Sequence, residues 1–242
     1  MHHSEANFPV DAMCGRFDQH TLPYRYAGYI DAIVRAAPEE PPARYNVAPR
    51  TSAWVARATR EGGRELTPLL WGLVSYWDED PEKAVKPINA RSESAAVRPM
   101  FRKLMEIHRC VVPVDGFYEW RKTPAGRLPY YIRSADATPM LLAGLWDRWQ
   151  RGAAAPIETF TILTTPANAS IARLHDRMPA IIAPEDLARW LDTRAKDPAA
   201  AQALLKPYPL ERLRVYPVSR RVNSANNEGA DLIEPVEGEP VG

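Results

Sequence analysis

The chain has 242 residues, of which 45% are hydrophobic and 25% charged, as is usual for a globular domain. No apolar run is long enough to span a membrane, and residues 1–12 lack the basic and apolar regions of a secretion signal. The only two cysteines, Cys14 and Cys110, exclude a disulfide framework and a four-cysteine zinc site. We therefore expect a cytoplasmic protein without a membrane partner, a metal or a cofactor.

Acidic residues gather at the two ends of the chain. Residues 1–13 and 228–242 hold seven Asp and Glu and no Lys or Arg, which leaves 31 basic against 23 acidic residues between them. The formal charge of this middle part is about +8, which suits a polyanionic partner. We expect a single domain at residues 14–227, an acidic disordered tail at 228–242, and a leader or mis-assigned start at 1–13.

Prolines outnumber glycines by 24 to 12, so long helices should be few. In chain order, the apolar spacing and the turn residues predict a helix at 24–37, strands at 53–58 and 66–71, a helix at 99–107, strands at 110–118, 129–133, 140–146 and 160–165, a helix at 184–192, and a strand at 213–218. Strands predominate and do not alternate regularly with helices. This pattern predicts an α+β fold with a mainly antiparallel sheet or barrel-like core and a few flanking helices.

Four short stretches place polar groups beside apolar or turn residues, in loops or at the ends of predicted strands. They are Met-Cys-Gly-Arg-Phe at 13–17, Asn-Ala-Arg-Ser-Glu at 89–93, Asp-Gly-Phe-Tyr-Glu-Trp at 115–120, and Leu-His-Asp-Arg-Met-Pro at 174–179. Functional sites are usually built at such positions.

Supporting stretches lie at 45–49, 71–73 and 113–116. Together, and in their order along the chain, these motifs resemble the SRAP family, the SOS-response-associated peptidases. The resemblance extends from Cys14 to about Val222. The resemblance implies abasic-site processing in the DNA damage response. It implies a catalytic cysteine at the mature N-terminus and three further active-site residues, here Cys14, Asn89, Glu119 and His175. It also implies a DNA-binding face, which matches Arg16, Trp71, Arg91, Arg98, Trp120 and Arg177.

The expected chemistry uses both nucleophiles of an N-terminal cysteine. The α-amine of Cys14 would form a Schiff base with the aldehyde of an abasic site, and the thiol would close a thiazolidine ring, with nearby Arg16 favouring the thiolate. Glu119 would transfer a proton at the sugar oxygen, and His175 would act at the Schiff-base stage and in any lyase step. Asn89 would orient the amine or a sugar oxygen. The partner would be single-stranded DNA bound through phosphates and stacked bases by a monomer.

Simpler interpretations exist for single residues and for the whole chain. Trp71 could pack in the core, and Cys110, within an apolar run, is expected there. A cysteine peptidase or amidohydrolase with an N-terminal nucleophile is the main alternative function. A non-catalytic single-strand-binding module is the third.

The family begins at Met-Cys, whereas thirteen residues precede Cys14 here. An internal cysteine has only an amide nitrogen and forms no Schiff base. Either translation begins at Met13 and that methionine is removed, or the chain cuts itself before Cys14. We favour the first route, because residues 1–13 show no periodic apolar pattern.

Overall fold

The computed structural model describes residues 14–35, 41–124, 126–152 and 155–237. The strands are β1 (Phe17–Gln19), β2 (Ile33–Val34), β3 (Arg44–Val47), β4 (Ser52–Ala58), β5 (Arg64–Trp71), β6 (Asn89–Arg91), β7 (Arg109–Val114), β8 (Gly116–Thr123), β9 (Gly126–Ser134), β10 (Met140–Trp149), β11 (Ile157–Pro166), β12 (Arg177–Pro179), β13 (Ile181–Ile182) and β14 (Leu213–Pro217). The α-helices are α1 (Pro23–Ile30), α2 (Ser92–Ala95), α3 (Pro99–Ile107), α4 (Leu187–Leu191) and α5 (Pro198–Gln202). Short 3-10 helices lie at η1 (Ile171–Arg173), η2 (Pro184–Asp186), η3 (Leu210–Arg212), η4 (Arg220–Asn223) and η5 (Ala230–Ile233).

The strands form two sheets. One has five strands in the order β14-β9-β8-β1-β3, and every neighbouring pair in it is antiparallel. The other has nine strands along the path β12-β11-β10-β7-β4-β5-β2, with β13 against β10 and β6 against β11. Its parallel pairs are β2–β5, β5–β11 and β6–β11. The predicted α+β fold with a mainly antiparallel core is thus confirmed.

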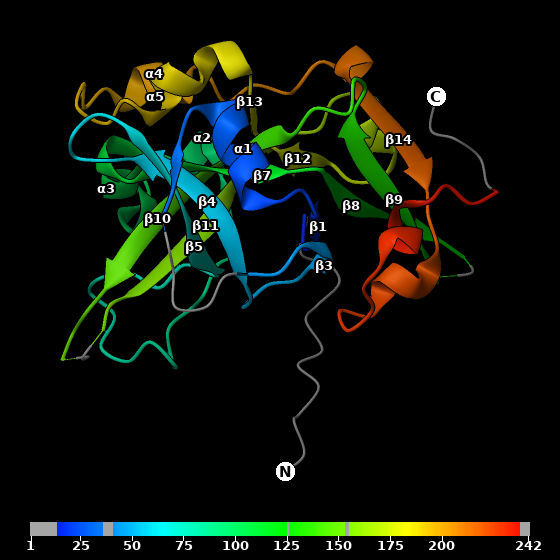
Figure 1. Ribbon diagram of the computed structural model, residues 1–242, viewed down its shortest axis with the longest axis horizontal. Helices are drawn as coiled ribbons and strands as arrows, with labels where there is room; N and C mark the ends of the chain where they lie inside the picture. The colour runs from blue at the N-terminus through cyan, green and yellow to red at the C-terminus, as the bar shows by residue number, and fades with distance from the viewer. Residues whose placement is uncertain (1–13, 36–40, 125, 153–154, 238–242) are drawn as a thin grey trace.

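The two sheets face each other across an apolar cluster, here called the inter-sheet cluster. It draws side chains from β1, β8 and β9 of the smaller sheet and from β4, β5, β7, β10 and β11 of the larger one. Along β7 the side chains alternate, so that Val112 points into this cluster and Val111 points to the other face. On that other face α1, α3, α4 and α5 pack against the larger sheet (Figure 1).

A third apolar cluster covers the outer face of the five-stranded sheet. Tyr118 and Trp120 of β8 lie there against Val222 and Leu232 from the end of the chain. The C-terminal segment therefore forms a layer outside β8 and β9 (Figure 1). Part of the tail expected to be disordered is held on the domain, because Leu232 is buried and the main-chain N–H of Val236 donates to the carbonyl of Pro217. Residues 238–242 of the predicted tail lie outside the described residues.

Two element predictions differ from the structure. The helix expected at 24–37 ends at Ile30, because Asp31 adopts a left-handed conformation (φ 51°) and β2 follows it. The strand expected at 110–118 is two strands, β7 and β8, which belong to different sheets and are separated at Asp115. Gly116 follows this break, and a Cβ there would lie 2.2 Å from the ring of Tyr131. A side chain at this position would push β9 away from β8.

The other predicted helices and strands are present with shifted bounds, and α3 matches its predicted range. Within the described part of the chain, no helix is both long enough and apolar enough to cross a membrane.

Candidate active site

Cys14 and Glu119 form a buried pair in the inter-sheet layer. Glu119 follows Phe117 by two residues on β8, so its side chain points to the same inner face of the sheet. The main-chain nitrogen of Cys14 donates a hydrogen bond to Glu119 Oε1 at 2.7 Å. Cys14 is fully buried, and Glu119 is 3% exposed. The two residues are 105 positions apart in sequence and are joined by the pairing of β1 with β8.

Burial dominates the acid–base properties of both groups. It raises the pKa of Glu119 from 4.5 to about 8, although hydrogen bonds from the Cys14 and Trp120 main chains act in the opposite direction. Burial, together with the nearby Glu119, also raises the pKa of the Cys14 thiol well above its ordinary value. The expectation that Arg16 favours the thiolate is therefore wrong, because the thiol is desolvated and lies beside a carboxyl group.

Asn89 and His175 lie on segments along opposite edges of β11, next to residues of the inter-sheet cluster. Asn89 begins β6, and its neighbour Ile88 packs against the inter-sheet cluster that contains Cys14. His175 follows Leu174, which is itself a member of that cluster. The four predicted site residues thus belong to segments that surround one apolar cluster, and a direct hydrogen bond joins Cys14 to Glu119.

The His175 ring has two partners at the same nitrogen. Its Nδ1 accepts the main-chain N–H of Arg177 at 3.1 Å and lies 2.8 Å from a carboxylate oxygen of Asp176. Both contacts are made at Nδ1, and they fix the orientation of the ring just before β12.

The four predicted DNA-binding arginines fall into two groups. Arg91 and Arg98 are exposed, and they immediately precede α2 and α3. Arg16 and Arg177 are largely engaged inside the protein. Arg177 forms a bidentate ion pair with Glu93, at 2.5 and 2.8 Å, and also donates to the carbonyl of Thr164. Arg91 and Arg98 are thus the two that are open to phosphate.

The two predicted DNA-binding tryptophans lie in the protein interior. Trp71 is fully buried, packs between Phe17 and Phe160, and donates its ring N–H to the carbonyl of Ile88. Trp120 is 8% exposed, and its ring N–H donates to Asn223 Oδ1 under the C-terminal segment. Neither ring presents a face on which a base could stack, so we reassign Trp71 to the core and Trp120 to the packing of that segment. Cys110 is also buried, as expected.

The loop before β6 carries two exposed aromatic rings that the sequence analysis does not single out. Tyr76 is 46% exposed and Trp77 is 37% exposed, and their rings meet edge to face at 4.9 Å. Lys103 of α3 lies over the Tyr76 ring. The signal in the sequence is two adjacent aromatic residues between Ser75 and Asp78, in a predicted loop. Aromatic rings beside a basic side chain suit single-stranded nucleic acid.

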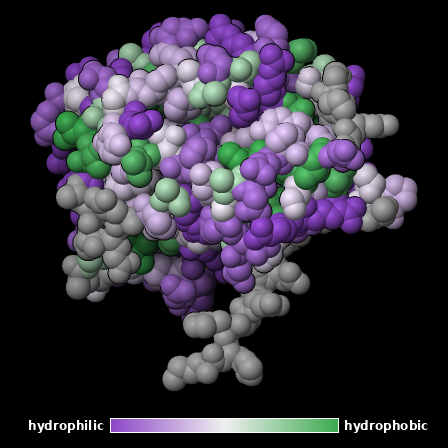
Figure 2. Space-filling model, turned by 45° about the vertical axis from the view of Figure 1, so that its right-hand side comes forward, coloured by the Kyte–Doolittle hydropathy of each residue, from purple (hydrophilic) through white to green (hydrophobic). Residues whose placement is uncertain are grey.

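The face of the molecule on the side of the five-stranded sheet is polar (Figure 2). Figure 2 shows that hydrophilic residues cover most of the face on the side of the five-stranded sheet, with hydrophobic residues in small separate areas. This face therefore resembles a polar binding surface more than an apolar docking surface.

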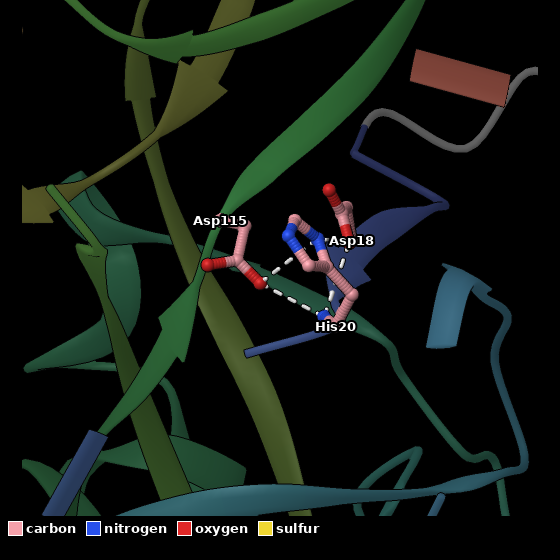
Figure 3. A group of neighbouring side chains, drawn as sticks. All are labelled: Asp18, His20 and Asp115. Atoms are coloured by element: carbon pink, nitrogen blue, oxygen red, sulfur yellow. Dashed lines mark hydrogen bonds and ion pairs between the residues drawn. The ribbon is translucent and has the colours of Figure 1, made fainter. Parts of the chain in front are cut away.

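A cluster of Asp18, His20 and Asp115 has the residue types of a metal site but is occupied by hydrogen bonds (Figure 3). His20 Nδ1 lies 2.8 Å from Asp18 Oδ1 and 3.3 Å from Asp115 Oδ2. Asp115 Oδ2 also accepts the main-chain N–H groups of His20 and Thr21 and the hydroxyl of Tyr26. An oxygen with three donors has no lone pair left for a cation. The cluster instead ties the end of β1 to the start of β8.

These features define a class of protein: two facing sheets that enclose a buried cysteine–glutamate pair, with exposed arginines on neighbouring segments. The chain belongs to the SOS response associated peptidase (SRAP) family, whose model matches residues 13–225.

Relatives of similar length occur in several organisms. The abasic site processing protein YoqW of Bacillus subtilis (strain 168) is 37% identical over 227 residues, which cover 92% of this chain and 99% of the relative. The abasic site processing protein YedK of Escherichia coli (strain K12) is 34% identical, with 93% and 100% covered. A crystal structure of a protein from Bacteroides thetaiotaomicron is similar with a TM-score of 0.84 at 25% identity, and the match covers 93% of this chain and 100% of that chain.

Proposed function

We propose that this protein recognises abasic sites in single-stranded DNA and binds them covalently through Cys14, once Cys14 is the N-terminal residue. The observation that supports this function most directly is the buried pair in which the Cys14 nitrogen lies 2.7 Å from Glu119 Oε1. The nitrogen that would attack the lesion thus already has a hydrogen-bond acceptor beside it. The abasic site processing proteins among the relatives agree with this substrate.

The reaction proceeds in two additions at one carbon. The α-amine of Cys14 adds to the aldehyde carbon of the open-chain sugar, and water leaves to form an imine. The thiol then adds to the same carbon, the thiol proton passes to the imine nitrogen, and a five-membered thiazolidine closes. One water molecule is lost overall, and no oxidant or metal takes part.

Three side chains assist these steps. Glu119, whose carboxyl group is buried at the Cys14 nitrogen, accepts and returns protons, and this suits both the opening of the sugar and the transfer from thiol to nitrogen. His175 serves the Schiff-base stage and any strand cleavage by β-elimination. Asn89 orients the amine or a sugar oxygen by hydrogen bonds.

DNA binding relies on exposed groups near these segments. Arg91 and Arg98 bind phosphates, which anchors the strand without reading its sequence. Tyr76 and Trp77 provide exposed rings for base stacking, in place of Trp71. Arg16 and Arg177 contribute to DNA contact only through those N–H groups that their internal partners leave open.

The peptidase alternative finds less support at this site. A cysteine peptidase needs a thiolate, which is formed where nearby positive charge lowers the pKa of the thiol. Here burial and Glu119 raise the pKa of Cys14. The thiazolidine reaction tolerates a protonated thiol, because the amine attacks first and the thiol proton is needed on the nitrogen.

Intact-mass measurement tests the proposal. Protein that begins at Cys14 is incubated with a single-stranded oligonucleotide that carries one abasic site. The expected product has the mass of protein plus oligonucleotide less one water, and it survives heating. Absence of this product, with equal affinity for intact and abasic strands, would identify a non-catalytic binding module.

Variants of Cys14 provide the control. Cys14→Ala keeps a terminal amine, so it forms at most a labile imine, and Cys14→Ser gives a less stable ring. A heat-stable adduct with Cys14→Ala would exclude the thiazolidine. Release of amide or peptide fragments by the parent protein, without an adduct, would favour the peptidase alternative.

A further inference from the structure

A nucleophile at the end of a chain needs a device that holds it in place. Terminal residues are poorly ordered unless they are tied down, and no residue precedes Cys14 once it is the N-terminus. Its hydrogen bond to Glu119 is part of the reaction and must change during it. Contacts made by the residues that follow Cys14 must therefore help to fix its position. The first of these residues with side-chain hydrogen bonds is Arg16.

Arg16 is fixed by the C-terminal strap, defined here as residues 220–228. One guanidinium nitrogen of Arg16, Nη1, donates to the carbonyl of Val222 and to the side-chain oxygen of Asn46, both at 3.0 Å. The other, Nη2, donates to the carbonyl of Asn223 at 3.3 Å. Three acceptors on two separate segments thus define where this side chain lies.

Asn46 of β3 joins Arg16 to the strap. Its side chain is fully buried, and its amide nitrogen donates to the carbonyls of Ser224 and Asn227 at 2.9 and 3.0 Å, with a longer contact to Val222. Its oxygen accepts from Arg16. An amide side chain suits this buried position, because a carboxylate has no donor and a hydroxyl has only one, whereas two carbonyls of the strap must be satisfied at close range while Arg16 needs an acceptor.

The strap is itself anchored at both of its ends. Val222 is fully buried against Trp120, and the Trp120 ring N–H donates to Asn223 Oδ1 at 2.7 Å. At the far end the Glu228 carboxylate accepts from the Arg44 side chain at 2.8 Å and from the main chain of Tyr45 at 2.9 Å. The strap is therefore a fixed surface against which Arg16 can be held.

We propose that the C-terminal strap, acting through Asn46 and Arg16, positions the Cys14 nucleophile against Glu119. This inference rests on the proposed function, since it concerns the same reaction. Asn46 and Arg16 are positioning residues, which act on the reaction through the placement of Cys14. The strap thus acts on the first residue of the mature chain from more than 200 positions away.

The test separates the rate of adduct formation from DNA affinity. Asn46→Ala, in protein that begins at Cys14, is mixed in excess with an abasic oligonucleotide, and the maximal single-turnover rate and the half-saturating protein concentration are measured. We expect the maximal rate to fall about tenfold or more, because small displacements of a reacting group cost this much or more. The half-saturating concentration should change less than about twofold. Asp231→Asn, which removes a surface ion pair with Arg221 of the strap, is the matched control and should react at the parent rate.

Arg16→Lys gives a second, independent variant that keeps the charge. A single ammonium cannot reach all three acceptors in the same geometry, so the maximal rate should fall while the salt dependence of binding stays unchanged. If both residues act together, the maximal rate of the double variant should be no lower than that of the slower single variant. Arg16→Lys also decides the matter if Asn46→Ala does not fold.

Two outcomes would overturn this inference. A higher half-saturating concentration with an unchanged maximal rate would make Asn46 and Arg16 DNA-binding residues. Parent rates in both variants would leave the strap without a role in the reaction. Failure of the parent protein itself to form an adduct would instead overturn the proposed function, so the two failures are distinguishable.

Discussion

The main-chain nitrogen of Cys14 and the carboxyl group of Glu119 share one hydrogen bond inside the inter-sheet layer. With residues before Cys14 the donor is a neutral amide, and Glu119 keeps its proton near neutral pH because its pKa is about 8. With Cys14 at the N-terminus the donor is an amine. A protonated amine at this distance would stabilise the Glu119 carboxylate, so the two groups would share a proton at the start of the reaction.

The first prediction concerns stability in the chain that keeps an amide at Cys14. Between pH 4.5 and about pH 8 the folded protein retains the Glu119 proton, whereas the unfolded chain has lost it. The free energy of unfolding therefore falls as the pH rises through this range. Glu119→Gln removes this dependence. Relative to the parent, we expect its free energy of unfolding to increase between about pH 5 and pH 8 by on the order of a few kcal/mol.

Urea denaturation across this pH range provides the measurement. Glu185→Gln, at an exposed position on η2, is the control and should follow the parent curve. Parallel curves for Glu119→Gln and the parent would show that Glu119 titrates alike in the folded and unfolded states.

The second prediction concerns proton transfer in protein that begins at Cys14. Glu119→Gln and His175→Ala should each slow adduct formation by about 10²-fold, because each removes a proton carrier. DNA affinity, measured by fluorescence anisotropy, should change little. Affinity that fell in step with the rate would assign both residues to binding.

The third prediction concerns phosphate contacts. Arg91→Ala and Arg98→Ala should weaken binding of single-stranded DNA uniformly across sequences. Each should also lower, by about 0.7, the steepness with which the logarithm of the affinity falls with the logarithm of the salt concentration. Arg189→Ala, on the exposed side of α4 and paired with Asp186, is the control and should bind as the parent does. An unchanged salt dependence of binding in the first two variants would place those arginines away from the bound DNA.

The fourth prediction concerns the exposed rings. Trp77→Ala should weaken binding by roughly 1–3 kcal/mol if one base stacks there. Tyr24→Ala removes a more exposed ring on α1 and should have no effect. Titration of fluorescent oligonucleotides measures both, and equal losses in the two variants would rule out specific stacking at Trp77.

Long apolar segments made much of the fold predictable. In β10 the run from Met140 to Leu145 is buried throughout, and such a run identifies a central strand from sequence alone. Strands of two to four residues, such as β6 and β12, carry no such pattern. They exist because β11 lies between them and pairs with both.

The site was predictable in part, for a related reason. The family motifs place Cys14 and Glu119 together, but no local pattern links residues 105 positions apart. Trp71 sits in a motif, and only the packing of Phe17 and Phe160 around it shows that it belongs to the core. The acidic composition of residues 228–242, with its Pro and Gly residues, predicts disorder. Leu232 is nevertheless buried, by aromatic residues on the outer face of β8 and β9.

The last prediction concerns the thirteen residues before Cys14. While they are attached, the Cys14 nitrogen is an amide whose lone pair is delocalised, and it forms no Schiff base. The thiol alone could add to the aldehyde only as a reversible hemithioacetal. A chain with Met13→Leu that is verified by mass to keep residues 1–13 should therefore bind abasic single strands but yield no heat-stable adduct. The same chain shortened to begin at Cys14 should yield it. Incubation of the longer chain by itself, followed by mass measurement, reports whether it cuts before Cys14. A heat-stable adduct at Cys14 in a chain whose leader is intact would defeat the mechanism proposed here.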